Sequence, residues 1–389
     1  MKKQLLFVIN HLTIGGIQKT LISAIKAIDY NKYDVTVYLR KNRTDLLPFI
    51  DKRANVIVNN DTNKYYRKPR ALWIQILIEI NKLTGRKQKA EKVKKELNEL
   101  INSYCMEYEY KSFFADKKFD TAIAYANGYP AYFVADYINA DEKIIFFHTS
   151  TNDLPDVHKK FIAKFDKACA VHNGLVSLIS EWHPCLEGKI SVVENYVDAD
   201  SLKKQSSEKV ISKPDDKTVL CSCGRFAPVK GFDLAIESAK ALKEKGMKFL
   251  WYFVGDGPEK DKLVSMAEKY KLSDNIIFTG MQKNPYPYMA ACDIYVQPSY
   301  EEAMPVTIIE AHRLGKPVIT TATVGGKKLV ENNTNGIVCE INSNAIAKSV
   351  INLINDKEKF CNIINNLKTT DYSHEFEKYK EQWKALLEG

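Results

Sequence analysis

Short apolar runs alternate with helical patterns along most of the chain. The run Leu5–Asn10 is followed by helical spacing over Gln18–Ile28 and by a second apolar run, Val35–Leu39. Runs this short and this continuously apolar are typical of strands covered on both faces, as in a parallel sheet. The strand pattern continues at Thr121–Tyr125, Ile144–Phe147 and Lys167–Val171. The first half of the chain therefore predicts a βαβ series.

The pattern restarts after a polar stretch. Ser201–Lys217 is rich in Lys, Ser and Asp, which predicts a surface connection or domain boundary. Helical spacing over Asp233–Lys245 and Val306–Leu314 separates a second set of apolar runs. These runs are Val219–Cys223, Phe249–Val254, Ile276–Thr279, Ile294–Gln297, Val318–Thr320 and Ile337–Cys339. Two successive βαβ series predict an α/β protein with two doubly wound, Rossmann-like domains facing a central cleft that holds the ligand.

The length of 389 residues fits two domains of about 150–200 residues each. We expect a first domain over 1–195 and a second over 196–370. The remaining segment, 371–389, contains apolar side chains at helical spacing, so we expect it to pack back toward the first domain as a closing helix. Those side chains are Phe376, Tyr379, Trp383 and Leu387.

Composition bears on location. The longest apolar stretch, Ala71–Ile80, contains Gln75 and Glu79 and is far shorter than the ~20 residues that span a membrane. The apolar run Leu5–Ile9 is shorter than the ~7–15 residues of a signal peptide. We therefore expect a cytoplasmic protein. Its eight scattered cysteines predict no disulfide framework, and Cys221 and Cys223 fit the buried face of a strand.

The positive charge is concentrated in one segment. Lys64–Lys95 contains eleven Lys and Arg against two Glu, which equals the net charge of +9 for the whole chain. A uniformly basic protein would indicate nucleic acid, whereas one basic segment on a neutral body indicates a local anionic partner. Beside the apolar run with Trp73, it fits a helix on an anionic membrane or a site for a lipid diphosphate. A solvated helix with its apolar side toward the core is the alternative.

Two glutamates mark one candidate site. Glu302 follows the predicted strand Ile294–Gln297, and Glu310 lies on the next predicted helix. Both belong at the carboxyl edge of a parallel sheet, where α/β proteins bind ligands. A carboxylate there can accept hydrogen bonds from two hydroxyls of a polyol. Two solvated glutamates on an ordinary helix are the alternative.

A second loop carries cations. Gly224 allows a close turn after the strand Val219–Cys223, and Arg225 and Lys230 flank the loop that follows. Two cations five residues apart can clamp a diphosphate, or they can be ordinary surface charges. Gly255 and Gly257 end the next strand, where they either admit a nucleotide base or form a plain turn.

Together these motifs resemble the retaining glycosyltransferases of family 4, which have the GT-B fold. The resemblance is strong over residues 219–340 and weaker over 1–200. It implies that Arg225 and Lys230 contact the donor diphosphate and stabilise it as the leaving group. Glu302 then lies beside the donor sugar, and Glu310 binds the ribose hydroxyls.

The resemblance extends to the first domain, which binds the acceptor in this family. Gly15 and Gly16 resemble a glycine loop whose backbone approaches the donor phosphates, and its place before a helix suits an anion. His148 matches a histidine at the rim of the cleft near the donor sugar, although a core histidine fits as well. Asn195-Tyr196-Val197-Asp198 resembles the stretch that leads into the second domain.

Three positions depart from the family pattern. Tyr196 stands where the linker of the family usually has a glycine. Lys327-Lys328 follows Gly325-Gly326, whereas the family usually has a glutamate three residues after this pair of glycines. Asp198-Ala199-Asp200 mimics the metal site of the other large glycosyltransferase fold but lies outside the donor loops. We therefore expect no metal cofactor.

The resemblance implies a retaining glycosyltransferase at the inner face of the cell membrane. It would transfer sugar from a nucleotide sugar, expected to be UDP-linked, to a lipid-carrier-linked saccharide in bacterial surface polysaccharide or capsule synthesis. A nucleotide-sugar epimerase of similar fold would need no acceptor. A nucleotide-binding module without catalysis is disfavoured by the joint presence of Arg225, Lys230, Glu302 and Glu310.

Overall fold

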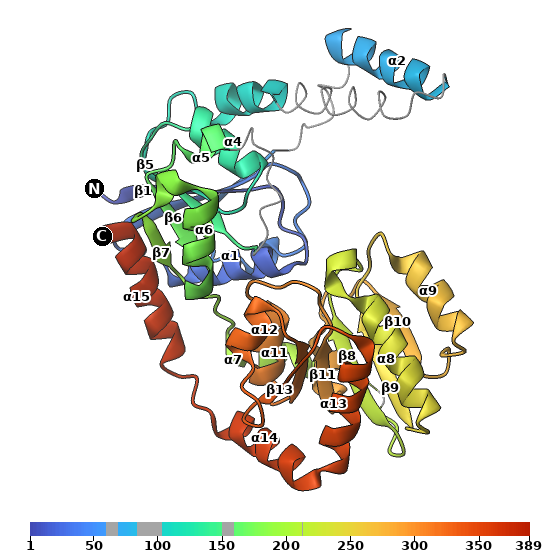
Figure 1. The fold of residues 1–389 in the computed structure, drawn as a ribbon. Coiled ribbons are helices and arrows are strands. Elements are labelled where there is room, and N and C mark those ends of the chain that lie inside the picture. The colour runs from blue at the N-terminus through green and yellow to red at the C-terminus, as the bar shows by residue number, and fades with distance from the viewer. Residues whose placement is uncertain (60–68, 84–102, 150–158, 212) are drawn as a thin grey trace.

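The computed structural model describes residues 1–59, 69–83, 103–149, 159–211 and 213–389. Two parallel sheets follow one another along the chain (Figure 1). The first has the order β3-β2-β1-β4-β5-β6-β7 and the second the order β10-β9-β8-β11-β12-β13. In each sheet the direction in which the chain adds strands reverses at the strand that comes first in the sequence, β1 or β8. This reversal confirms the prediction of two doubly wound domains.

The strands of the first sheet are β1 (Lys3–Ile9), β2 (Tyr33–Leu39), β3 (Asn55–Val58), β4 (Phe119–Ala124), β5 (Ala140–Phe147), β6 (Lys167–Ala170) and β7 (Ile190–Val192). Those of the second are β8 (Thr218–Cys223), β9 (Phe249–Val254), β10 (Ile276–Gly280), β11 (Ile294–Gln297), β12 (Val318–Thr321) and β13 (Gly336–Cys339).

The α-helices are α1 (Gly16–Ala27), α2 (Pro69–Leu83), α4 (Tyr129–Asp136), α5 (Lys159–Ile162), α6 (Val176–Trp182), α7 (Ala199–Ser206), α8 (Phe232–Glu244), α9 (Lys260–Lys269), α10 (Tyr286–Ala291), α11 (Val306–Arg313), α12 (Val324–Leu329), α13 (Ser343–Asn355), α14 (Lys357–Thr369) and α15 (Glu375–Glu388). Residues 103–113 are also helical. Short 3-10 turns are Leu47–Phe49, Asn173–Leu175, Pro184–Leu186 and Pro228–Lys230.

The first sheet is buried on both faces. Leu5, Phe7 and Ile9 of β1 share a core with side chains of α1 and α15, whereas Leu6 and Val8 share the opposite core with α4 and α6. Successive side chains of a strand point to opposite faces, so a strand between two helical layers must be apolar at every position. This arrangement explains the continuous apolar runs of the sequence.

The connection between the sheets is partly helical. α7 begins at Ala199, and its Leu202 is buried against Val219 and Cys221 of β8. Residues 201–206 of the predicted surface connection or domain boundary are therefore helical. A buried leucine fixes this helix to the second sheet although its other side chains are polar.

The last helix leaves the second domain and packs on the first. Trp383 of α15 is buried, and its indole stacks on Phe146 of β5, with ring centroids 5.3 Å apart. The same indole lies 5.8 Å from the ring of Phe7 of β1. Residues on the first and the last elements of the chain therefore share one core.

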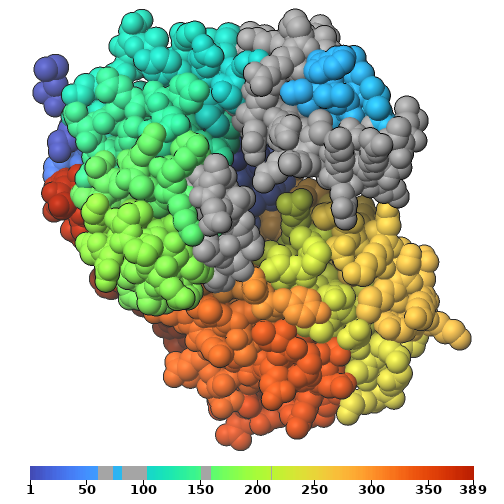
Figure 2. Space-filling view, turned by 45° about the horizontal axis from the view of Figure 1, so that its top comes forward, coloured from blue at the N-terminus to red at the C-terminus, as the bar shows by residue number. Residues whose placement is uncertain are grey.

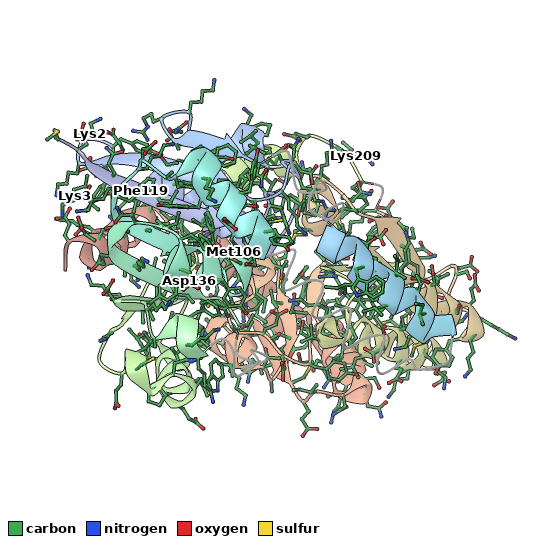
Figure 3. All side chains as sticks on the ribbon, turned by 90° about the horizontal axis from the view of Figure 1, so that it is seen from above. Lys2, Lys3, Met106, Phe119, Asp136 and Lys209 are labelled. Atoms are coloured by element: carbon green, nitrogen blue, oxygen red, sulfur yellow. The ribbon has the colours of Figure 1, made fainter. Side chains whose placement is uncertain are left out.

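α2 projects from the first domain above the second, beyond the helix that carries Met106 (Figures 1 and 3). Its inner side contacts that helix through Ile78, which is buried against Cys105. Trp73, Ile76 and Ile80 are 60%, 51% and 48% exposed. In the described ranges, no helix combines the length and the apolar character needed to cross a bilayer.

Candidate active site

Glu302 lies on the loop that follows β11, as predicted, and its side chain is only 10% exposed. Its Oε1 accepts hydrogen bonds from Nζ of Lys230 at 2.7 Å, Oγ of Ser299 at 2.9 Å and Nε2 of Gln297 at 3.0 Å. Donors on three sides fix the carboxylate in one orientation. The sequence indicated Glu302 and Lys230 separately, but not Gln297 and Ser299 as its supports.

The loop of Lys230 packs closely on the loop of Glu302. Gly231 has a φ of +63°, and a Cβ at this position would lie 2.0 Å from the carbonyl oxygen of Pro298. Tyr300 donates its backbone N–H to the carbonyl of Val229 across the same contact. Only glycine permits this approach, because it accepts a positive φ and has no side chain. The close packing brings Lys230 to Glu302.

Arg225 lies on the same loop, between β8 and α8. Its side chain is exposed and forms no ion pair with the part of the chain that the structure describes. The two cations of the loop therefore differ, because Lys230 is held by Glu302 and Arg225 projects with its charge unpaired by those residues.

The glycines of the neighbouring turns have a packing role. Gly224 donates its N–H to the carbonyl of Val254 at 3.0 Å. A Cβ on Gly255 would lie 1.9 Å from the carbonyl oxygen of Gly224, and a Cβ on Gly257 would lie 2.4 Å from that of Phe226. These glycines allow the turn after β9 to touch the cation-bearing loop.

Glu310 lies on α11 and is 1% exposed. Its Oε1 accepts hydrogen bonds from Nζ of Lys19 at 2.6 Å and from the hydroxyl of Tyr286 at 2.9 Å. The same ammonium lies 4.7 Å from the centre of the Tyr286 ring. Lys19 belongs to α1, so this ion pair joins the two domains.

Burial acts to lower the pKa of Lys19, but the nearby charge of Glu310 and the hydrogen bonds of the pair outweigh it and hold this pKa above its ordinary value. Lys19 is therefore a cation at neutral pH. No sequence pattern indicates this partner of Glu310, because a lysine one turn into a helix resembles any surface lysine.

The glycine loop meets the second domain at α11. Gly15 precedes α1 with an extended backbone and has no side chain to cap the N–H groups of the first turn. A Cβ on Gly16 would lie 3.7 Å from a methyl group of Val306, the first residue of α11. The amino-terminal ends of α1 and α11 therefore face each other across the domain boundary.

His148 follows β5 at the carboxyl edge of the first sheet. Its Nε2 lies 3.1 Å from the carbonyl oxygen of Tyr125, which can only accept, so Nε2 carries the proton and Nδ1 carries a lone pair. Burial lowers the pKa of His148 to about 4, despite the opposing effect of that hydrogen bond. No described hydrogen bond connects His148 to the second domain.

The residues after Glu302 reach into the first domain. Ala303 is buried in the core of the first domain with Leu175, and Met304 packs against the same core. Asn195 donates its Nδ2–H to the carbonyl of Met304 at 3.3 Å. The loop that carries Glu302 therefore lies at the domain boundary, and Figure 2 shows a hollow between the two parts of the chain, with dark-blue atoms of the first part at its base.

The Asp-x-Asp sequence serves as a helix cap. Oδ1 of Asp198 accepts the backbone N–H groups of Asp200 and Ser201 at the start of α7, and Oδ2 pairs with Lys26 at 2.5 Å. Within the described ranges, no three His, Cys, Asp or Glu side chains are grouped to hold a metal ion. Cys221 and Cys223 are buried with their sulfurs 3.6 Å apart, as the core interpretation predicts.

Residues 203–370 match the family described as Glycosyl transferases group 1. An uncharacterized glycosyltransferase of Haemophilus influenzae is 30% identical over 179 residues, 46% of this chain and 50% of that protein. The lipopolysaccharide core biosynthesis glycosyltransferase LpsE of Rhizobium meliloti is 30% identical over 169 residues, 43% of this chain and 48% of that protein. The chain thus spans about half the length of the curated relatives it matches.

Solved structures match over the whole chain. TarM of S. aureus, in complex with fondaparinux, α-GlcNAc-glycerol and UDP, superposes with a TM-score of 0.71 at 15% identity, covering 100% of both chains. HepE of Anabaena, in complex with UDP-glucose, superposes with a TM-score of 0.70 at 16% identity, covering 99% of both chains. These neighbours confirm the GT-B fold.

Proposed function

We propose that the protein is a retaining glycosyltransferase that moves a sugar from a UDP-sugar to a saccharide on a lipid carrier. The observation that carries this proposal is the placement of Lys230, Glu302 and Glu310 at the carboxyl edge of the second sheet, within residues that match a glycosyltransferase family. Structural neighbours were solved with UDP or UDP-glucose, which supports the choice of nucleotide.

The donor would bind with its diphosphate between Arg225, Lys230 and the uncapped amino-terminal end of α1. Free N–H groups at a helix start favour an anion, and Gly15 supplies no side chain of its own to compete for them. Glu310 would accept a hydrogen bond from the ribose. Glu302, held beside Lys230, would face the sugar.

The reaction would proceed by breaking the bond between the sugar and the phosphate oxygen. Both electrons of that bond stay with the departing diphosphate, whose charge Arg225 and Lys230 stabilise. Positive charge develops on the sugar ring beside the carboxylate of Glu302. The acceptor hydroxyl attacks from the face that the phosphate leaves, and its proton passes to the departing phosphate oxygen. No step of this scheme needs a metal ion.

His148 would contribute a neutral imidazole. Because Nε2 donates to the carbonyl of Tyr125, the lone pair of Nδ1 is the group that remains to accept a hydrogen bond from a sugar hydroxyl. The lowered pKa keeps this lone pair unprotonated over the physiological range.

The acceptor side would lie at a membrane. Trp73, Ile76 and Ile80 occupy positions i, i+3 and i+7 of α2 and therefore share one exposed face of that helix. The cations from Arg86 to Lys95 lie outside the described residues. An apolar helix face next to a basic segment favours the surface of an anionic membrane, where a lipid-linked saccharide is reached. The relative LpsE acts in lipopolysaccharide core biosynthesis, so we place this acceptor in surface polysaccharide synthesis.

Incubation of the purified protein with a panel of UDP-sugars, with and without a lipid-linked saccharide, tests the proposal. We expect UDP release to depend on the acceptor and the new bond to keep the anomeric configuration of the donor. Sugar conversion with donor alone would indicate an epimerase. Nucleotide binding without turnover under any condition would indicate a binding module.

A further inference from the structure

The ion pair between Lys19 and Glu310 joins the proposed nucleotide site to the other domain. Glu310 and Tyr286 both belong to the second domain, so their hydrogen bond is independent of how the domains sit. Lys19 belongs to α1 of the first domain, and its 2.6 Å bond to Oε1 of Glu310 requires the two domains to be together. The hydrogen bond from Lys19 to Glu310 can therefore form only when the two domains are closed on each other.

The second oxygen of the same carboxylate lacks a partner. Oε2 of Glu310 is buried and accepts no hydrogen bond from any described residue. A buried acceptor without a donor is costly, and such atoms are rare unless a ligand or water completes them. Oε1 already receives two donors, so an incoming hydroxyl has Oε2 as its acceptor.

We propose that Lys19 is a positioning residue for the nucleotide, holding Glu310 from the first domain so that Oε2 faces a ribose hydroxyl when the domains close. This inference rests on the proposed function, because it takes the ligand of Glu310 to be a ribose. Oε2 is buried in the closed arrangement, so the nucleotide enters while α1 and α11 are apart. The Lys19 bond then forms on closing.

The same helix offers a matched control. Lys26 of α1 also pairs with a carboxylate from beyond the first domain, that of Asp198, at 2.5 Å. That carboxylate caps α7 and has no contact with Glu310 among the described hydrogen bonds. If lysines of α1 only tie the two parts of the chain together, Lys19→Met and Lys26→Met will have similar effects.

Calorimetric titration with UDP tests the role of Lys19, after thermal unfolding has shown that each variant folds. We expect Lys19→Met to weaken UDP binding by about tenfold or more, the effect of losing one charged hydrogen bond. Lys19→Arg, which keeps the cation, is expected to restore most of the affinity. Lys26→Met is expected to bind UDP like wild type.

Equal affinities for Lys19→Met and Lys26→Met would overturn the inference, and so would tighter binding by Lys19→Met, which would make Lys19 a competitor of the nucleotide. In either case the proposed function stands if Glu310→Ala still weakens UDP binding. If UDP binds neither wild type nor any variant, the proposed function itself fails.

Discussion

Lys230 and Glu302 lie 72 positions apart in the sequence, and their side chains form an ion pair of 2.7 Å at the domain boundary. The pair places a cation and an anion on two loops that touch through Gly231 and Pro298. In the proposed function, a diphosphate at Lys230 would therefore meet an ammonium whose position is already fixed. Charges fixed in advance stabilise a developing anion without reorganisation during the reaction.

The first prediction concerns the leaving group. Replacing Arg225 or Lys230 with Ala should lower turnover by about 100-fold or more, the loss expected for one preorganised charge contact. The measurement is the initial rate of sugar transfer at saturating donor. Rates within threefold of wild type for both variants would show that neither cation contacts the diphosphate.

The second prediction separates the two glutamates. Glu310→Ala should weaken the binding of UDP itself, because Glu310 is assigned to the ribose. Glu302→Ala should leave UDP affinity nearly unchanged and impair only the step that involves the sugar. Calorimetry with UDP, paired with transfer rates, measures both effects, and equal losses of UDP affinity in the two variants would contradict this division.

The third prediction concerns stability and pH. His312 on α11 is 8% exposed, and burial, aided by the charge of Arg313, lowers its pKa from 6.5 to about 4. Between these values the unfolded chain binds a proton that the folded protein does not. The free energy of unfolding should therefore fall as the pH is lowered from 6.5 to 4, by at most about 3 kcal/mol from this group.

Urea denaturation at pH 7, 5.5 and 4.5 measures this dependence. His312→Gln should reduce the loss of stability between pH 7 and 4.5, because the replaced side chain no longer titrates. An identical pH dependence in wild type and His312→Gln would show that this histidine is not buried as a neutral group.

The fourth prediction concerns metal. Sugar transfer should survive excess EDTA, because the proposed mechanism takes its positive charge from Arg225 and Lys230. Asp198→Ala should cost about 0.5–2 kcal/mol of stability through the lost helix cap and leave the response to EDTA unchanged. Activity that EDTA abolishes and Mg²⁺ or Mn²⁺ restores would reopen a metal-dependent mechanism.

The fifth prediction concerns the membrane. Replacing Trp73, Ile76 and Ile80 with Ser should reduce binding to anionic vesicles by about tenfold or more, since each exposed apolar side chain contributes to burial at the interface. Thermal stability should be nearly unchanged, because the three side chains are exposed. Val210→Ser, at an apolar position 93% exposed in the polar connection before the second sheet, is the matched control.

The electrostatic part of the same interaction has its own test. Vesicle binding should fall steeply with added salt and should be lost when six cations are replaced by Gln, at about 1 kcal/mol per cation. Co-sedimentation of the six-fold variant at wild-type levels would make this segment an ordinary solvated stretch. The six are Arg86, Lys87, Lys89, Lys92, Lys94 and Lys95.

The strands that could be predicted are those whose burial is complete. β9 and the part of β1 from Leu5 to Ile9 are continuously apolar because helices cover both faces. β3 and β7 were missed because they are short, stand at the two edges of the first sheet and are only partly buried. The pairing of β3 and β7 depends on strands that are distant in sequence, so the pattern of apolar residues within each short strand does not predict it.

The candidate site shows the same limit. Arg225, Lys230 and Glu302 could be singled out because their loops follow predicted strands, and Glu310 because it lies on the helix that follows the loop of Glu302. The Lys19 bond to Glu310 spans 291 positions and two domains, so no local pattern encodes it. Asp198 shows a different limit, because an N-cap and a metal ligand use the same residue type, and only the backbone contacts distinguish them.

The stacking of Trp383 on Phe146 has a consequence for synthesis. The core of the first sheet is completed by Tyr379, Trp383 and Leu386 of α15. While the ribosome adds the second domain, the first sheet exposes the apolar surface that these side chains later cover. The core of the amino-terminal half of the nascent chain therefore stays partly uncovered until residues 375–388 have been synthesised and have left the ribosome.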